Sequence, residues 1–271
     1  MSHIRVGIVG AAGRMGQALV REVLSSDGVR LVAACEENSH PKVGEDAGLL
    51  AGTGEIGVAI GDDSEEMFSS VDCAIEFSGP IPTVLHARLA AEKKVMHVVG
   101  TTGLDREQEN ELELAARNTQ MFWAPNMSIG VNVLVDLVER GAAALDEQFD
   151  AEVLEMHHRR KVDAPSGTAL ALGEAVAKGR GVRLEEVARR VRDGITGERL
   201  RGEIGFAVLR GGDVVGDHRV ILASDNERVE LAHIASSRQI FAAGAVSAAL
   251  WLNGKAPGLY GMKDMLGLQD A

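Results

Sequence analysis

The sequence predicts an α/β protein whose first part is a doubly wound parallel sheet and whose second part is a smaller α+β domain with a mixed sheet. Short apolar runs alternate with longer helical patterns through the first half, and a glycine-rich segment joins the first run to the first helix. In the second half, strand-like runs follow one another with little helix between them. Strand–helix alternation is typical of parallel sheets, whereas consecutive strands indicate a mixed or antiparallel sheet.

The apolar runs of the first half have the length of strands and carry little charge, as suits strands that are buried on both faces. They lie at Ile4–Val9, Leu31–Cys35, Val71–Phe77, Val95–Val99 and Met121–Ala124. Helices are predicted between them at Arg14–Ser25, Pro82–Lys93 and Asp105–Asn118. In the first helix, Met15, Leu19 and Val23 recur at a spacing of three to four residues and form one apolar face.

The pattern changes after Asn126. The second half contains predicted helices at Ile129–Leu145, from about Gly167 and around Leu184–Val191, and predicted strands at Glu152–His157, Ile204–Arg210, Arg219–Ala223 and Arg228–Ala235. A last, alanine-rich helix at Gln239–Trp251 is expected to pack back on the first domain. We therefore predict a dinucleotide-binding domain over residues 1–128, completed by 239–271, and a substrate-binding and oligomerisation domain over 129–238.

Composition narrows the class of protein. The 271 residues carry a formal net charge of −12, which disfavours nucleic acid and anionic membrane surfaces as partners. The two cysteines, Cys35 and Cys73, lack the spacing of a disulfide framework or a metal site, which favours a reducing compartment. An apolar run begins at Ile4 and no window is long and apolar enough to span a membrane, so we expect a cytoplasmic protein.

A glycine-rich turn follows the first predicted strand. Glycines permit a tight turn and a close backbone approach to a pyrophosphate at a helix N-terminus, where free N–H groups favour anions. The spacing G-x-x-G-x-x-G differs from the usual fingerprint, and a purely structural glycine turn is the alternative. The segment comprises Gly10, Ala11, Ala12, Gly13, Arg14, Met15 and Gly16.

An acidic pair, Glu36 and Glu37, ends the next predicted strand, where a carboxylate binds the adenosine ribose in Rossmann-like sheets. This second feature favours dinucleotide binding over a structural turn. A carboxylate at 37 would repel the 2′-phosphate of NADPH, and the nearest basic residue, Lys42, follows a proline. We therefore expect NADH to be preferred over NADPH.

Two further loops follow strands of the predicted parallel sheet, where ligands collect. Small, hydroxyl and amide residues there could hold the nicotinamide end of the cofactor, although ordinary strand-to-helix turn chemistry is the alternative. These residues are Gly100, Thr101 and Thr102 in the first loop, and Ala124, Pro125, Asn126 and Met127 in the second.

The most informative segment spans residues 152–169, E-V-L-E-M-H-H-R-R-K-V-D-A-P-S-G-T-A. Its five consecutive basic or potentially basic residues could form a solvated face. A metal site is disfavoured, because adjacent histidines on a strand point to opposite faces and no further ligand has suitable spacing. Pro165 to Thr168 begin a predicted helix, and its N-terminus together with the cations would bind a small dicarboxylate. Histidine or a lysine of lowered pKa could donate a proton, so the two halves together indicate a reductase.

Residues 152–169 match every fixed position of E-[IV]-x-E-x-H-x-x-x-K-x-D-x-P-S-G-T-A, the signature of the 4-hydroxy-tetrahydrodipicolinate reductase (dihydrodipicolinate reductase) family. The chain resembles this family over nearly its whole length, including GAAGRMG at 10–16, Gly100-Thr101-Thr102, Asn126, Gly130-Val131-Asn132 and Ala235-Ser236-Ser237-Arg238.

The resemblance implies NAD(P)H-dependent reduction of a cyclic dicarboxylate with loss of water, in lysine and diaminopimelate biosynthesis. It implies that His157 and Lys161 handle protons, without deciding which of them donates. His158, Lys161, Gly167 and Thr168 would bind the substrate carboxylates. Members are typically homotetramers assembled through the sheet of the second domain.

The chain departs from familiar members at two positions. Glu37 stands where many carry an arginine for the NADP phosphate, and Gly79 stands where some carry a basic residue. Both departures agree with a preference for NADH. Two rival functions are weaker: a semialdehyde dehydrogenase needs a cysteine nucleophile, whereas both cysteines lie in predicted strands. A dinucleotide-binding redox sensor would not need the segment at 152–169.

Overall fold

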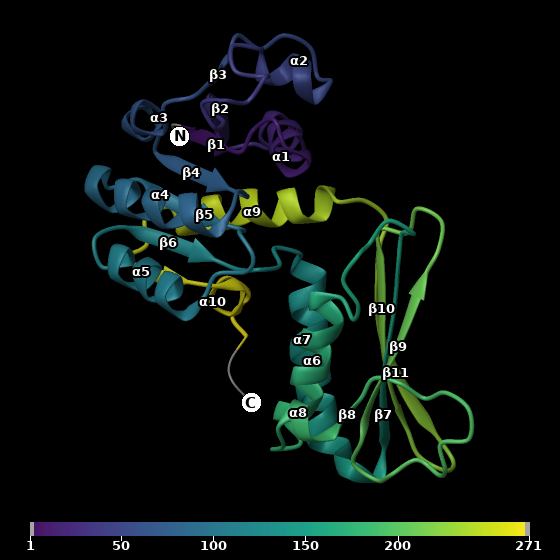
Figure 1. The fold of residues 1–271 in the computed structure, drawn as a ribbon. Coiled ribbons are helices and arrows are strands. Elements are labelled where there is room, and N and C mark those ends of the chain that lie inside the picture. Colours follow the sequence, from purple (N-terminus) through teal and green to yellow (C-terminus); the bar gives the residue numbers. More distant parts are fainter. Residues whose placement is uncertain (1–2, 269–271) are drawn as a thin grey trace. The chain divides into compact units, whose positions relative to one another are not determined.

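The computed structural model describes residues 3–268. Contacts divide these residues into two units: unit 1 comprises residues 3–128 and Arg238–Gly267, and unit 2 comprises Ile129–Ser237 and Leu268. Each unit has its own sheet and its own apolar core (Figure 1). No helix in the described range combines the length and apolarity that a membrane span requires.

Unit 1 is a parallel sheet of seven strands in the order β12-β6-β5-β4-β1-β2-β3. Its strands are β1 (Ile4–Val9), β2 (Val29–Cys35), β3 (Ile60–Gly61), β4 (Cys73–Glu76), β5 (Met96–Val99), β6 (Gln120–Trp123) and β12 (Gly258–Tyr260). Every strand pairing in this sheet is parallel. The carboxyl ends of its strands therefore meet at one edge, which is where doubly wound sheets bind ligands.

Helices cover both faces of this sheet. They are α1 (Arg14–Ser25), α2 (Ala47–Ala51), α3 (Ser64–Ser70), α4 (Pro80–Lys93), α5 (Arg106–Ala116), α9 (Gln239–Leu252) and α10 (Met262–Leu266). One core joins buried residues of α1 and α9 to Val6 and Ile8 of β1, and another joins α3, α4 and α5 to the opposite face. The last long helix, α9, belongs to unit 1, and Gln239 Nε2 donates a hydrogen bond to the Ala18 carbonyl of α1.

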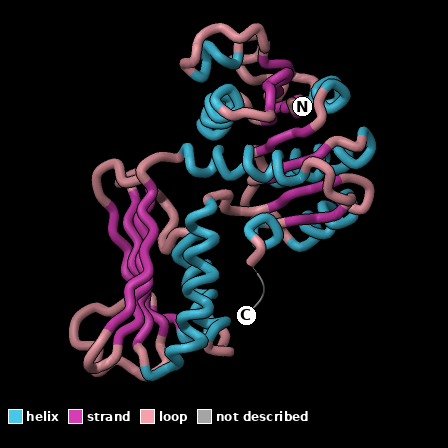
Figure 2. Tube along the Cα trace, turned by 180° about the vertical axis from the view of Figure 1, so that it is seen from behind, coloured by secondary structure: helices cyan, strands magenta, loops and turns pink. Residues whose placement is uncertain are grey.

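Unit 2 combines a mixed five-stranded sheet, ordered β11-β10-β7-β9-β8, with helices on one face (Figure 2). Its strands are β7 (Asp150–His157), β8 (Ala188–Arg189), β9 (Ile204–Arg210), β10 (Gly216–Ala223) and β11 (Arg228–Ala235). Its helices are α6 (Ile129–Leu145), the 3-10 turn η1 (Asp146–Gln148), α7 (Gly167–Gly179) and α8 (Leu184–Val187). The pairings of β7 with β9 and β9 with β8 are parallel, whereas β10 runs antiparallel to both β7 and β11.

The fold class predicted from the sequence is confirmed, and the errors lie in short elements. The helix predicted around Leu184–Val191 ends at Val187, because Ala188 and Arg189 pair with Ile204 and Gly205 of β9. The strand predicted from Arg219 begins at Gly216. The five short elements α2, β3, α3, β12 and α10 were not predicted, because runs of two to seven residues carry little periodic signal.

Candidate functional site

The glycine-rich turn connects β1 to α1 at the ligand-binding edge of unit 1. Gly10 has a φ of +73°, in the left-handed region that favours glycine, and a Cβ on Gly16 would stand 2.1 Å from the Gly10 carbonyl oxygen. Gly13 precedes α1 and offers no side chain to cap it, and the first turn contains no acidic residue. The first turn of α1 therefore supplies no carboxylate to its own backbone N–H groups. An N-terminus of this kind is suited to binding a pyrophosphate.

The predicted ribose-binding carboxylate lies beside this turn. Glu36 follows β2, and its Oε2 accepts a hydrogen bond of 3.0 Å from the Ala12 N–H. Glu37 is exposed, and Lys42, the nearest basic residue in the sequence, pairs with Glu45 at 2.8 Å. Glu36 thus contacts the glycine turn, and Lys42 is paired elsewhere.

Two acidic residues near this point were not singled out from the sequence. Asp62 and Asp63 follow β3, and the Glu36 N–H donates to the Gly61 carbonyl at 3.0 Å. Burial, and after it the charges of Glu36, Asp63 and Asp62, raise the pKa of the Cys35 thiol to about 11. The field around the end of β2 is therefore negative.

The two other predicted cofactor loops also lie at strand ends in unit 1. Gly100 and the buried Thr101 follow β5, whereas Thr102 is exposed. In the second loop, Ala124 and Met127 are buried, Pro125 is exposed, and Asn126 Oδ1 accepts from the Ser128 N–H at 2.9 Å. Ala124 N–H donates to the Val99 carbonyl at 3.1 Å, so this loop is tied to the end of β5.

In unit 2, strand β7 ends at His157, whose imidazole is nearly buried. Its Nδ1 lies 2.6 Å from Glu155 Oε2, so the neutral ring carries its proton on Nδ1 and leaves Nε2 as the acceptor. A Cβ at Gly216 of β10 would stand 3.1 Å from that Nε2. A larger residue at 216 would therefore crowd this nitrogen.

Glu155 is the centre of a network that the sequence did not reveal. Its side chain is buried, and Arg210 of β9 donates to both of its oxygens, at 2.8 and 3.0 Å. The Ser166 N–H donates to Oε1 at 3.0 Å. Burial alone would raise the pKa of Glu155, but the hydrogen bonds from Arg210, His157 and Ser166 lower it below its ordinary value.

Lys161 lies in the loop after β7, and Arg210 links this loop to the same network. Lys161 Nζ pairs with Asp163 Oδ1 at 2.8 Å, which lowers the pKa of Asp163. Arg210 Nη2 also donates to the Asp163 carbonyl at 2.7 Å. One guanidinium therefore contacts both the partner of His157 and the segment that carries Lys161.

His218 of β10, a second residue missed from the sequence, packs against His157. The two ring centroids are 5.0 Å apart, and His218 Nε2 lies 3.1 Å from Ser166 Oγ. Burial, and secondarily the neighbouring His157, lower the pKa of His218 to about 4. His218 is therefore neutral at pH 7. Strand pairing brings His218 here, and no local motif marks it.

The predicted carboxylate seat at the start of α7 includes a hydroxyl that has protein partners. Ser166 caps α7 by accepting from the Ala169 N–H at 3.2 Å, and it also contacts His218. Its hydroxyl is thus engaged within the protein. Gly167 is exposed and Thr168 is half-buried in the first turn of α7, and His158 is half-buried at the end of β7.

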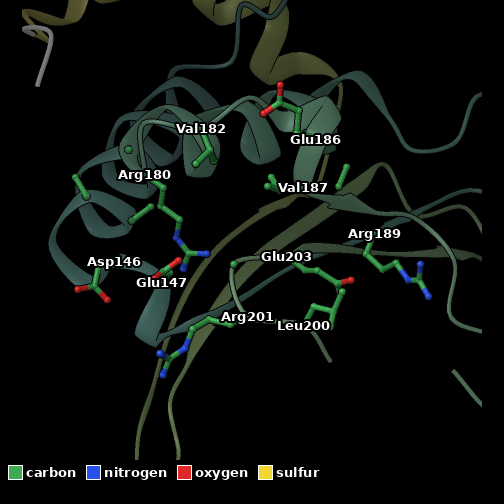
Figure 3. Close-up of a pocket in the computed structure, with 15 residues that line it drawn as sticks. Asp146, Glu147, Arg180, Val182, Glu186, Val187, Arg189, Leu200, Arg201 and Glu203 are labelled. Atoms are coloured by element: carbon green, nitrogen blue, oxygen red, sulfur yellow. The ribbon is translucent and has the colours of Figure 1, made fainter. Parts of the chain in front are cut away.

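One cavity in unit 2 lies away from these groups. A cavity of about 670 Å³ in unit 2 is lined by acidic and basic side chains together, among them Arg180 and Glu203 (Figure 3). None of the predicted site residues lines it. The volume of this cavity therefore does not point to the predicted site residues.

A thiol nucleophile is disfavoured by the surroundings of both cysteines. Cys35 and Cys73 are buried in strands β2 and β4, and burial raises the pKa of both thiols. A protonated, buried thiol is a poor nucleophile at neutral pH. The chemistry of a semialdehyde dehydrogenase therefore has no suitable cysteine among the described residues.

Known proteins resemble this chain along its whole length. Residues 4–127 match the family model described as "Dihydrodipicolinate reductase, N-terminus", and residues 130–266 match "Dihydrodipicolinate reductase, C-terminus". The 4-hydroxy-tetrahydrodipicolinate reductase of Ruegeria pomeroyi is 56% identical over 99% of this chain and 100% of its own length. That of Brucella abortus is 53% identical over 96% of this chain and 98% of its own length.

The fold has a solved counterpart. The structure described as "Dipicolinate bound Dihydrodipicolinate reductase from Paenisporosarcina sp. TG-14" is 25% identical and has a TM-score of 0.77, covering 97% of this chain and 99% of its own. The matches to both family models, the identities above 50% and this shared fold agree with one another. The chain therefore belongs to the dihydrodipicolinate reductase family, also called the 4-hydroxy-tetrahydrodipicolinate reductases.

Proposed function

We propose that this chain reduces 4-hydroxy-tetrahydrodipicolinate to tetrahydrodipicolinate, with loss of water, in lysine and diaminopimelate biosynthesis. The observation that carries the proposal is the network in which Arg210 of β9 joins Glu155 and His157, two residues of the signature segment of this family. A bound NADH or NADPH supplies the hydride. The glycine turn, Glu36 and the loops at Gly100 and Ala124 are the groups of unit 1 that would hold it.

Unit 2 offers the groups that bind a small dianion. The Lys161 ammonium and the His158 imidazole lie in the segment that follows β7. Gly167 and Thr168 provide backbone N–H groups in the first turn of α7, where the helix dipole favours anions. Holding both carboxylates fixes the ring of the substrate, which converts a bimolecular encounter into a positioned one.

The proton step is assigned to His157 together with Lys161. Loss of the hydroxyl group as water leaves a conjugated C=C–C=N system in the ring. Hydride added to the far carbon of this system moves negative charge toward the ring nitrogen, which a proton then neutralises. A protonated His157 stabilises this charge from Nε2, while Glu155 on Nδ1 stabilises the imidazolium. The Lys161 ammonium, in the loop that follows His157, carries a second proton. His157 and Lys161 therefore both stay candidates for the proton donor.

The finer proposal for the cofactor is a preference for NADH. Glu37, Asp62 and Asp63 place negative charge around the end of β2, where a 2′-phosphate would lie. Like charges at this position disfavour NADPH without affecting the unphosphorylated ribose.

Glu37→Arg is expected to raise the NADPH-to-NADH ratio of kcat/KM at least about tenfold, because a guanidinium binds a phosphate that the carboxylate repels. The measurement is kcat/KM with each cofactor at saturating substrate. Glu113→Arg, on the exposed surface of α5, makes the same change of charge away from β2 and should leave the ratio unchanged. Equal ratios in wild type and Glu37→Arg, or a wild type that favours NADPH tenfold, would contradict the preference.

Glu155→Gln is expected to lower kcat at least about tenfold. This loss is a part of the rate enhancement of about 10²–10⁴ that a positioned general acid contributes. Both carboxylate oxygens accept from donors, so an amide nitrogen at either position would face a donor. Loss of the negative charge should also move the alkaline limb of the kcat profile to lower pH, which a purely structural role would not do.

The control for this variant lies on the same strand. Glu152→Gln removes a carboxylate that Arg192 binds at 2.8 and 2.9 Å, near the opposite end of β7. We expect its kcat and pH profile to match those of the wild type. If both variants behave alike, Glu155 does not position the acid.

The proposed activity is tested by NADH oxidation with freshly prepared product of the preceding synthase. Turnover that requires both NADH and this compound supports the proposal. Binding of NADH without turnover of the synthase product would contradict it and would favour a dinucleotide sensor.

The assembly and location follow the family expectation. We propose a homotetramer formed through the sheet of unit 2, where Ile234 of β11 and Leu209 of β9 are exposed apolar residues. Sedimentation at several concentrations would test this state. The two buried, unpaired thiols favour a reducing, cytoplasmic setting.

A further inference from the structure

Unit 1 buries a carboxylate at the ligand-binding edge of its sheet. Glu76 is the last residue of β4 and is 0% exposed. His86 Nδ1 lies 2.8 Å from Oε1, His97 Nε2 lies 2.8 Å from Oε2, and the Ser78 hydroxyl also donates to Oε1. We call Glu76, His86, His97 and Ser78 the Glu76 cluster. Burial alone would raise the pKa of Glu76, but the two histidines outweigh it and lower the pKa to about 2.

Buried apolar side chains surround the Glu76 cluster, so its hydrogen bonds lie in a low-dielectric environment. The fully buried Phe68 stacks on His86 and meets His97 edge-on, with both ring centroids 5.7 Å away. His97 Nδ1 is buried and has no hydrogen-bond partner among the described residues. The geometry places a proton of His97 on Nε2, toward Glu76, because a proton on Nδ1 would be a buried donor without an acceptor.

Two histidines and a carboxylate can also bind a metal ion. Here each imidazole nitrogen makes a direct hydrogen bond to a carboxylate oxygen, which leaves no space for an ion between them. No group of three such side chains within residues 3–268 has a geometry that could hold a metal. The Glu76 cluster is thus a hydrogen-bond network.

This network extends to three neighbouring strand ends. Ser78 Oγ lies 3.5 Å from Thr83 Oγ1, which donates to Thr101 Oγ1 at 2.8 Å. The Thr101 carbonyl in turn accepts from Trp123 Nε1 at 3.2 Å. The ends of β4, β5 and β6 are therefore connected through side chains.

The residue between Glu76 and Ser78 contacts the glycines of two candidate cofactor loops. A Cβ on Gly100 would stand 2.2 Å from Phe77 Cε1, and a Cβ on Gly10 would stand 3.3 Å from the Phe77 carbonyl oxygen. The position of segment 76–78 thus limits both the glycine turn and the loop after β5. Proteins in which apolar side chains replace a buried charged group are often equally stable, so core stability alone does not explain the buried carboxylate of Glu76.

We propose that Glu76 is a positioning residue for the dinucleotide. Its carboxylate is held by His86 and His97 and fixes the Ser78 hydroxyl. Through Thr83, this hydroxyl in turn positions the loop at Thr101, which receives the nicotinamide half of the cofactor. This inference rests on the proposed function only in assuming that a dinucleotide binds at this edge. Glu76 acts through Ser78 and Thr101 and does not itself contact the reacting atoms.

The test is NADH binding to the full chain with Glu76→Gln, measured by fluorescence titration without substrate. The amide nitrogen would face a donor, so we expect Kd for NADH to rise about tenfold, whereas kcat at saturating NADH stays within about threefold. Binding of pyridine-2,6-dicarboxylate, which we assign to unit 2, should not change. Ser78→Ala should weaken NADH binding too, and the double variant should be no weaker than Glu76→Gln, because both act through one hydroxyl.

The matched control lies at the other end of the same sheet. The buried Thr119 hydroxyl donates to the Val95 carbonyl at 2.8 Å, so Thr119→Val also removes a buried hydrogen bond from unit 1. It should lower the melting temperature and leave Kd for NADH unchanged. Wild-type affinity in Glu76→Gln, or equal losses in Thr119→Val, would overturn the inference while leaving the reductase function intact.

Two other outcomes are also decisive. If Glu76→Gln does not fold, Ser78→Ala decides alone, and wild-type affinity in that variant overturns the inference. A wild type that binds neither NADH nor NADPH would overturn the proposed function and this inference together.

Discussion

His157→Gln lowers kcat at least about a hundredfold, the lower limit for losing a positioned general acid. The imidazole is held by a 2.6 Å contact to Glu155, and a residue larger than Gly216 would crowd its Nε2. Glutamine keeps a hydrogen-bonding side chain of similar length but cannot donate a proton as an imidazolium does. The loss should therefore appear in kcat, with little change in dinucleotide binding.

Single-turnover rates and NADH titrations of the same preparation separate the two effects. A His157→Gln variant with wild-type kcat would remove this imidazole from the mechanism. A variant that loses NADH affinity in proportion to its rate would show that the substitution disturbs more than the proton step.

Lys161→Ala is also expected to lower kcat at least about a hundredfold, because it removes a second candidate acid and one of the cations proposed to bind the substrate. Lys161 is only 20% exposed and pairs with Asp163 at 2.8 Å, so the ammonium is held within the loop. Unlike His157→Gln, this variant should also raise KM for the dicarboxylate, since a carboxylate loses its counter-charge. Dinucleotide affinity should again change little.

Lys178→Ala provides the matched control for this prediction. Lys178 lies near the end of α7 and pairs with Glu139 at 2.7 Å, within the same unit. We expect kcat and KM of this variant to stay within about twofold of the wild type, as is usual for surface substitutions. Unchanged activity in Lys161→Ala would exclude the ammonium from both proposed roles.

Comparing the two variants also bears on which residue donates the proton. If His157 donates, the pH dependence of kcat should disappear in His157→Gln and persist in Lys161→Ala. The opposite pattern would assign the donor to Lys161. Either result leaves the dianion-binding role of Lys161 to be judged from KM.

The local features of the fold could be predicted from the sequence because they depend on neighbours along the chain. Ile4–Val9, Arg14–Ser25 and Ile129–Leu145 are uniform runs or single-faced helices, and the structure has them at these residues. The glycine turn and Glu36 could be paired because strands β1 and β2 are adjacent and parallel. His157 and Lys161 could be singled out because the signature segment is contiguous.

Tertiary structure alone decided which distant side chains surround these residues. Arg210 and His218 reach the site because β9 and β10 pair with β7 on its two sides, a register that no local pattern encodes. Glu76 becomes a buried, hydrogen-bonded charge only because α4 and β5 bring His86 and His97 to it. Short-range steric effects between neighbours along the chain determine local conformation. The environment of a charged group depends instead on long-range packing, and this environment determines its protonation and its hydrogen-bond partners.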